Sequence, residues 1–127
     1  MQPLNDFSID KEIKEIKSKD KNNEIGAIIS LLGIAKGISK DKKPVEKVYF
    51  SPLEKAEKEI DRIKEEAIKK FNVKEIRIYH KFGEIEAGKS IALVIVAAKR
   101  RKEAFEACQY CINKMKDIFC LKEIYKA

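Results

Sequence analysis

Residues 90–108 read SIALVIVAAKRRKEAFEAC, and this stretch indicates the fold more clearly than any other. Residues 90–98 are almost wholly apolar, which predicts a strand buried on both faces. Residues 102–119 then carry apolar side chains at helical spacing, so a helix follows the strand directly. The four cations of residues 99–102 lie at the junction. Helix N-terminal N–H groups and fixed cations both attract anions, so this junction is a suitable place to bind a phosphate.

Working outward from this stretch, the chain alternates between strand and helix patterns. A helix is predicted from Leu53 to Phe71, with Ser51 and Pro52 as its cap and first position. Residues 24–35 are apolar on both faces and are predicted to form a buried central strand. Residues 36–47 are predicted to form a mobile basic loop, and residues 82–88 a turn-rich connection. Further strands are predicted at 48–50, 73–80 and 121–126, and an N-terminal helix and loop at 1–23, capped by Ser8 or Asp10.

This order of elements predicts a single domain spanning residues 1–127. It favours the α+β class, with helices packed on a mainly antiparallel or mixed sheet. The chain has 127 residues, of which 44% are hydrophobic, enough for one core. The charged share of 39%, mostly Lys and Glu, resembles the composition of thermophile proteins.

The net charge of +7 favours an anionic partner, but the cations alternate with Glu along the chain. That pattern is typical of a solvated surface, so we expect neither a nucleic-acid partner nor a membrane partner. No apolar run is long enough for a membrane span. Residues 1–6 lack the basic segment followed by an apolar segment that is typical of a signal peptide. The sequence therefore predicts a cytoplasmic protein.

Cys108, Cys111 and Cys120 are predicted to be small buried hydrophobic residues. Cys108 and Cys111 form a C-x-x-C pattern, but it lies inside a predicted helix, where the helix dipole does little to activate a thiol. Zinc binding and redox chemistry stay open as weaker alternatives, and a metal would need a fourth ligand.

The polar residues that remain as candidates for chemistry are cationic. The sequence has one histidine, no hydrolytic triad pattern and no phosphate-binding glycine loop. The candidates are Lys36, His80, Lys81, Lys99, Arg100, Arg101, Lys116 and Lys122. Among them, Lys116 is predicted to lie beside the apolar stripe of the last helix, which includes Phe119, and to be half sheltered. Such a lysine can act as an acid, a base or an oxyanion partner, or it can simply cover the edge of the core.

Several motifs, in order, resemble those of the large, catalytic subunit of molybdopterin synthase. Gly26–Lys36 is similar to the family's first strand, and His80–Glu84 to its His-Arg-hydrophobic-Gly-Glu loop. Ala104–Cys108 matches its Ala-Phe-Glu-Ala-Cys helix in full. The family's lysine near the helix end falls on Lys116, and Lys122–Tyr125 fits its Lys-Glu-hydrophobic-Tyr ending.

The resemblance implies an α/β-hammerhead fold and a homodimer within a heterotetramer. It implies sulfur transfer from the thiocarboxylated C-terminus of a small ubiquitin-like carrier, ending in Gly-Gly, to cyclic pyranopterin monophosphate. The product would be the dithiolene of molybdopterin, formed without a metal or other cofactor. The implied catalytic residues are Lys116 and Lys122. The implied substrate-binding residues are Arg100, Arg101, Lys36 and Lys99.

Three positions differ from the family pattern. Arg100 stands where the family has His, Lys36 stands where it has Arg, and the segment at Cys120–Lys122 is shortened. The sequence therefore leaves open a homologue that binds the carrier without turnover. A less favoured alternative is an unrelated basic nucleic-acid binder, whose affinity would depend steeply on salt.

Overall fold

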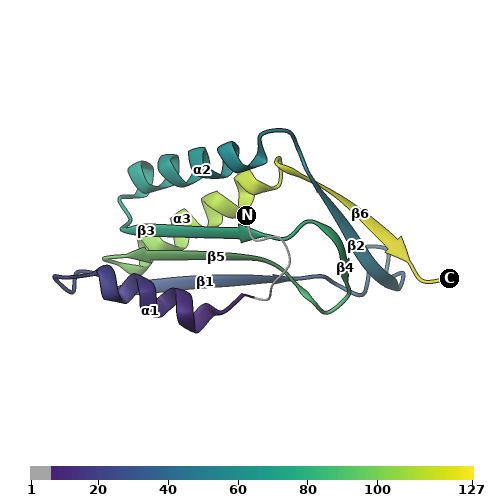
Figure 1. The fold of residues 1–127 in the computed structure, drawn as a ribbon, viewed down its shortest axis with the longest axis horizontal. Coiled ribbons are helices and arrows are strands. Elements are labelled where there is room, and N and C mark those ends of the chain that lie inside the picture. Colours follow the sequence, from purple (N-terminus) through teal and green to yellow (C-terminus); the bar gives the residue numbers. More distant parts are fainter. Residues whose placement is uncertain (1–6) are drawn as a thin grey trace.

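The computed structural model describes residues 7–127, and in this part of the chain three helices and six strands alternate (Figure 1). In chain order they are α1 (Ile9–Lys19), β1 (Ala27–Ile34), β2 (Val45–Pro52), α2 (Ala56–Phe71), β3 (Glu75–His80), β4 (Gly83–Glu86), β5 (Ser90–Ala98), α3 (Arg101–Met115) and β6 (Phe119–Tyr125). The strands form two antiparallel sheets, ordered β1-β5-β3 and β4-β2-β6. The predicted α+β class is therefore confirmed.

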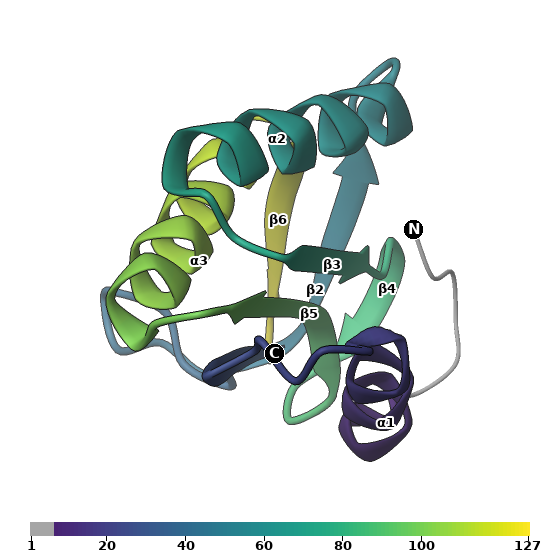
Figure 2. The same ribbon diagram turned by 90° about the vertical axis from the view of Figure 1, so that its left-hand side faces the viewer.

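The first sheet is covered by helices on both faces. β5 is its central strand, and Leu93–Ala98 are all buried, as the apolar run predicts. Helices α2 and α3 pack on one face, and α1 packs on the other (Figure 2). Successive side chains of a strand point to opposite faces, so Val94 and Val96 meet α2 and α3 while Leu93 and Ile95 meet α1.

β1 is an edge strand, which corrects the prediction of a buried central strand at residues 24–35. It pairs with β5 alone, from Ala27 opposite Ala98 to Ile34 opposite Ser90. Leu31, Leu32 and Ile34 remain 39–44% exposed. An apolar run predicts that both faces of a strand are covered, but no described strand pairs along the outer edge of β1, and its last residues are exposed on both faces.

β2 is longer than predicted, and this overturns the helix cap at Ser51 and Pro52. Both residues end β2, where they pair with Cys120 and Phe119 of β6. The N–H of Leu53 then donates to the Ile118 carbonyl, so the chain stays extended and Leu53 is exposed. The helix begins only at Ala56, after a left-handed residue at Lys55. Pairing with a distant strand has overridden the local capping signal.

The connections also differ in part from the prediction. The segment at 82–88 contains β4, whose Ile85 is buried opposite Val48. Within the predicted loop at 36–47, an antiparallel bridge joins Ile38 to Pro44, and residues 45–47 belong to β2. The mobility of this loop stays a prediction.

Helix α1 begins as predicted, because the Ser8 hydroxyl accepts a hydrogen bond from the Lys11 N–H. It runs to Lys19 before the polar loop. The part of the N-terminal prediction at residues 1–6 lies outside the described residues. Among the described helices, none has the length and apolar character needed to cross a membrane.

Candidate functional site

An apolar cavity of about 360 Å³ lies where the two sheets meet the end of α3. Its walls come from both sheets and from the last turn of that helix. The lining residues are Leu31 of β1, Phe50 of β2, His80 of β3, Ala92 and Val94 of β5, Ile112, Met115 and Lys116 at the end of α3, and Phe119 and Leu121 of β6. Only His80 and Lys116 among these carry side-chain nitrogen or oxygen atoms, so they are the polar groups that one chain contributes to the cavity wall.

Lys116 borders this cavity as the C-cap residue of α3. Its side chain is exposed rather than half sheltered as predicted. The prediction placed Phe119 in the apolar stripe of the helix, but α3 ends at Met115 and Phe119 begins β6. Lys116 follows the buried Met115 by one residue and therefore points about 100° away from it. An exposed lysine thus borders an apolar cavity.

His80 is the buried polar group of the cavity wall. Its ring stacks on Phe119, with the ring centroids 3.8 Å apart, and meets the edge of Phe50 at 4.9 Å. Nδ1 lies 2.5 Å from the carbonyl oxygen of Lys81. A carbonyl only accepts, so Nδ1 carries the proton and donates it. Burial lowers the pKa of His80 below its ordinary value, which favours the neutral ring at pH 7.

The other predicted site residues lie elsewhere. Lys99, Arg100 and Arg101 are exposed around the start of α3. Lys99 Nζ lies 3.6 Å from a carboxylate oxygen of Glu24. Arg100 Nε lies 3.4 Å from a carboxylate oxygen of Glu103. Lys99 and Arg100 border a broad depression of about 860 Å³ together with Lys70, Phe71, Asn72, Glu103 and Glu106. The positive charge predicted at this junction is therefore partly balanced by carboxylates.

The length of α3 separates this junction from the cavity. Arg101 and Lys116 are fifteen positions apart along a helix that rises 1.5 Å per residue, which places them about 22 Å apart. A single chain therefore does not bring the predicted arginine clamp and the predicted catalytic lysine to one small ligand.

Lys122 and Lys36 also lie outside the cavity wall. Lys122 pairs with Tyr49 across the second sheet, and both residues are exposed. Since Leu121 lines the cavity, its neighbour Lys122 points to the opposite face of β6. Lys36 follows the end of β1 and is exposed.

Sequence reasoning missed most of the cavity wall, including Phe50 and Leu121, and it named His80 as a candidate without assigning it to a site. One local signal was available for His80. Residues 76, 78 and 80 share one face of β3, and Ile76 and Ile78 are the buried pair, so His80 must be buried with them. For Phe50 and Leu121 no local signal exists, because they meet only through the pairing of β2 with β6.

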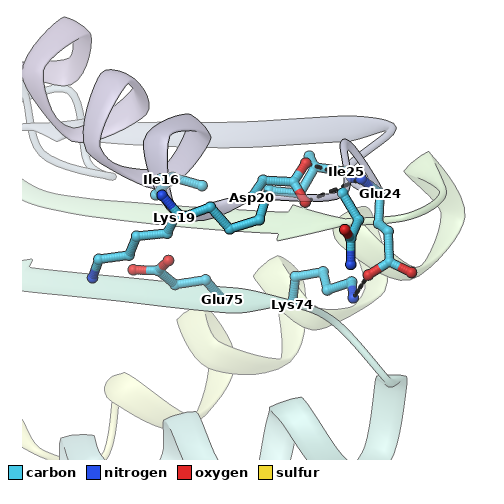
Figure 3. Close-up of a pocket in the computed structure, with 9 residues that line it drawn as sticks. Ile16, Lys19, Asp20, Glu24, Ile25, Lys74 and Glu75 are labelled. Carbon is cyan, nitrogen blue, oxygen red and sulfur yellow. Dashed lines mark hydrogen bonds and ion pairs between the residues drawn. The ribbon is translucent and has the colours of Figure 1, made fainter.

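A second pocket, of about 270 Å³, lies between the end of α1 and the start of β3 (Figure 3). The Asp20 carboxylate accepts the N–H groups of Glu24 and Ile25 at 3.0 and 2.9 Å, and these bonds hold the pKa of Asp20 below its ordinary value. Lys74 Nζ contacts the Glu24 carboxylate at 2.6 Å. These contacts join the turn between α1 and β1 to the start of β3.

Cys108 and Cys111 are buried in α3 with free thiols, as predicted. Burial raises the pKa of both, and that of Cys111 to about 12. Cys120 is exposed on β6, which corrects the prediction of burial. Within residues 7–127, no group of three or more His, Cys, Asp or Glu side chains is placed to hold a metal ion.

Comparison with known proteins identifies relatives over nearly the whole chain. The sequence model of the MoaE protein family matches residues 5–118. The chain is 35% identical over 111 residues to the molybdopterin synthase catalytic subunit of Pyrococcus abyssi, covering 87% of this chain and 72% of that one.

Solved structures show the same fold. The crystal structure of molybdopterin synthase from Staphylococcus aureus matches with a TM-score of 0.78 at 22% identity, over 99% of this chain and 88% of that one. A complex of subunits 1 and 2 of molybdopterin-converting factor from Helicobacter pylori matches with a TM-score of 0.68 at 20% identity, over 94% of this chain and 84% of that one.

Proposed function

Because this chain belongs to the MoaE family, the family of molybdopterin synthase catalytic subunits, we propose that it transfers sulfur to cyclic pyranopterin monophosphate. The sulfur donor in this proposal is the thiocarboxylated C-terminus of a small ubiquitin-like carrier protein that ends in Gly-Gly. The product is the dithiolene of molybdopterin. The observation that carries the proposal is the apolar cavity that Lys116 borders.

The shape and chemistry of the cavity suit such a tail. Two terminal glycines have no side chains, so the tail is thin enough to enter a cavity of about 360 Å³. Its terminal group is anionic, and Lys116 is the cation that borders the cavity. Apolar walls keep water away from the acyl group and strengthen the attraction between that group and the ammonium.

In the proposed step, the thiocarboxylate sulfur forms a bond to a side-chain carbon of the pterin as the carbon–oxygen bond at that carbon breaks, and the released oxygen takes up a proton. The dithiolene requires two such transfers, one to each of its sulfur-bearing carbons. The acyl–sulfur bond then breaks when water adds to the carbonyl carbon, and the carrier leaves as a carboxylate. Negative charge develops on the carbonyl oxygen as water adds. Lys116 is placed to stabilise that oxyanion and to return a proton to the departing sulfur. No metal or other cofactor is assigned a role in this step.

The phosphate of the substrate requires a second group of residues. We assign it to Arg100 and Arg101, with Lys99 and Lys36 as further cations, because Arg binds phosphate with two parallel hydrogen bonds. Since about 22 Å separates Arg101 from Lys116 along α3, we propose that a second copy of the chain supplies the arginines. The complete enzyme is then a homodimer with one carrier on each chain. The two-subunit complex from Helicobacter pylori supports a small-subunit partner.

Lys122 is the second catalytic lysine in this proposal. It points away from the cavity of its own chain, so its role also depends on the assembled complex. The cytoplasmic location predicted from the sequence stays a prediction.

The alternative is a homologue that binds the carrier without turnover. It is favoured by Arg100, which does not titrate near neutral pH as the family's His does. It is also favoured by Lys36, because a lysine cannot form the bidentate hydrogen bonds of the family's Arg.

A reconstituted synthase assay distinguishes the two. The chain is mixed with thiocarboxylated carrier and cyclic pyranopterin monophosphate, and the oxidised pterin product is read by fluorescence. Lys116→Ala tests the proposed lysine, and Lys114→Ala is the matched control, because Lys114 lies two residues earlier and borders a different pocket.

We expect product from the wild-type chain and from Lys114→Ala, and a loss of about a hundredfold or more from Lys116→Ala. Carrier binding without product from the wild-type chain would establish the binding homologue instead.

A further inference from the structure

Besides the amine of Lys116, the polar side chain that lines the cavity is that of His80, the only histidine of the chain. Nδ1 of His80 is bonded to the Lys81 carbonyl, and this bond fixes the proton on that nitrogen. Nε2 is then a bare acceptor. No described side-chain nitrogen or oxygen is both fully buried and without a partner, so Nε2 reaches the surface of the cavity that the ring lines.

The ring is held so that it cannot turn this acceptor away. Phe119 stacks on one face of the imidazole ring, with the ring centroids 3.8 Å apart, and the Phe50 centroid lies 4.9 Å away in an edge contact. The hydrogen bond from Nδ1 fixes the rotation of the ring about its Cβ–Cγ bond. These three contacts come from β6, β2 and the residue after β3. An acceptor fixed by three separate elements, in an otherwise apolar wall, is suited to select a ligand that brings an N–H or O–H donor.

We propose that His80 is a tail-binding residue, whose Nε2 accepts a hydrogen bond from a backbone N–H of the carrier tail inside the cavity. This inference rests on the proposed function, because the tail is the ligand. A Gly-Gly end offers only backbone donors to an acceptor in the wall. The terminal group contacts Lys116 at the border of the cavity, and one tail amide contacts His80, so two fixed points set the position of the acyl carbon.

The proposal predicts a pH dependence, because Nε2 accepts only while the ring is neutral. Among the described residues that line the cavity with the ring, the one other titratable group is the amine of Lys116 at the end of α3. Lys81 meets the ring through its backbone carbonyl, and its Nζ lies over the Phe7 ring, 5.2 Å from the ring centroid. The lining residues from β1, β2, β5 and β6 are all apolar. Histidine is the side chain that ordinarily changes charge between pH 5 and 8, so a change in affinity within this range reports on His80.

The first test measures binding of a short acetylated peptide ending in Gly-Gly to the full chain by calorimetry. His80→Phe keeps an aromatic ring for stacking and removes the acceptor, and we expect it to weaken binding about fivefold. Tyr79→Phe is the matched control, because residue 79 points to the opposite face of β3, under α1. It should bind the peptide as the wild-type chain does.

Methylated peptides locate the donor. One peptide carries an N-methyl group on the last amide, and another carries it on the preceding amide. We expect one of them to bind the wild-type chain about fivefold more weakly and to be insensitive to His80→Phe, since its donor is already missing. Equal sensitivity of all three peptides to His80→Phe would overturn the proposed bond.

The pH profile separates a hydrogen bond from a packing effect. For the wild-type chain and Tyr79→Phe, the Kd for the peptide should rise as the pH falls below the pKa of His80 in the unbound chain. The rise should be at most about tenfold per pH unit. His80→Phe should show no such rise. A profile that is the same in His80→Phe and in the wild-type chain would contradict the role.

Nitrogen NMR of the imidazole provides a direct observation, and a single histidine leaves no ambiguity of assignment. We expect the neutral Nδ1–H form at pH 7 and a shift of the Nε2 resonance when the Gly-Gly peptide is added. An Nε2–H form, or an unchanged Nε2 resonance at saturation, would overturn the proposal while leaving the synthase function intact. Failure of the wild-type chain to bind the peptide at all would overturn the tail-binding function together with it.

Discussion

Gly26 shows how one residue sets the geometry of the junction between β5 and α3. A side chain at this position would overlap the carbonyl oxygen of Lys99, while the Gly26 N–H donates to the Ala98 carbonyl at 2.9 Å. The obstacle is backbone, which cannot move aside as a flexible side chain can. We therefore expect Gly26→Ala to lower the free energy of unfolding by about 1–3 kcal/mol.

Gly33→Ala is the control for this change, because the nearest atom to its added methyl group lies 3.8 Å away, in ordinary contact. Urea unfolding followed by circular dichroism measures both variants. Equal stability of the two would show that the backbone at Lys99 yields more easily than the structure indicates.

The three thiols should differ sharply in reactivity. Cys108 and Cys111 are buried and burial raises the pKa of both, whereas Cys120 is exposed. A disulfide reagent such as DTNB should therefore modify one thiol of the native chain quickly and all three after unfolding in urea. Cys120→Ser should abolish the fast phase; a fast phase that persists would place an accessible thiol in α3.

At the scale of elements, the attachment of α1 to the sheet depends on Arg77. Its side chain is 12% exposed and contacts the carboxylates of Glu12, Glu15 and Glu75. Burial by itself lowers the pKa of Arg77, but the hydrogen bonds to Glu75, Glu15 and Glu12 raise it above its ordinary value. Arg77→Ala should cost about 3 kcal/mol of unfolding free energy, because it leaves half-buried carboxylates unpaired.

Arg62→Ala is the matched comparison, because Arg62 also contacts two glutamates but is 62% exposed on α2. Its loss should cost much less unfolding free energy than the loss of Arg77, because water screens an exposed ion pair. Thermal unfolding of both variants measures the difference, and a similar loss in each would mean that Arg77 contributes no more than a surface ion pair.

The same contact makes α1 sensitive to acid. The hydrogen bond from Arg77 lowers the pKa of Glu15 below its ordinary value of 4.5. Stability from this carboxylate is therefore fully present above about pH 4.5 and is lost as the pH falls through the lowered value. As the pH falls below 4.5, the protection of the α1 amides against hydrogen exchange, relative to an unfolded chain at the same pH, should decrease before that of the β5 amides. Glu15→Gln should make α1 exchange less dependent on pH in this range; an unchanged dependence would assign the effect to another group.

Elements with strong local patterns were predictable from the sequence, and those defined by distant partners were not. The apolar run of β5 and the 3.6-residue period of α2 each carry their own evidence. The edge position of β1, the extension of β2 through Pro52 and the existence of β4 depend on which strands pair with them. Strand pairing between residues far apart in the chain leaves no period in either segment.

The same distinction applies to the site. Lys116 was predicted as a site residue from its place beside the apolar stripe of the last helix and from a family motif, and its role stays a prediction. The cavity beside it joins residues as distant as Leu31 and Leu121, and only the folded chain brings them together. Conversely, the sequence grouped Arg101 with Lys116 as parts of one site, whereas the rigid length of α3 keeps them about 22 Å apart.

At the scale of the whole molecule, this separation predicts that the working site includes two chains. In a two-fold dimer, each site would take Lys116 from one chain and Arg101 from the other. Lys116→Ala and Arg101→Ala should each inactivate the pure dimer. A mixed dimer of the two variants then has one site with both changes and one site with neither. Random mixing makes about half of the dimers mixed, so activity should return to about a quarter of the wild-type level.

The measurement is the pterin fluorescence assay on the two variants, unfolded and refolded together and also refolded separately. Lys116→Ala mixed with a Lys122→Ala chain extends the same logic to the second lysine, which also points away from the cavity of its own chain. No recovery on mixing Lys116→Ala with Arg101→Ala would show that both residues act within one chain, because each variant chain would then carry one defective site whatever its partner. Full activity of the pure Arg101→Ala dimer would show instead that Arg101 has no part in the reaction.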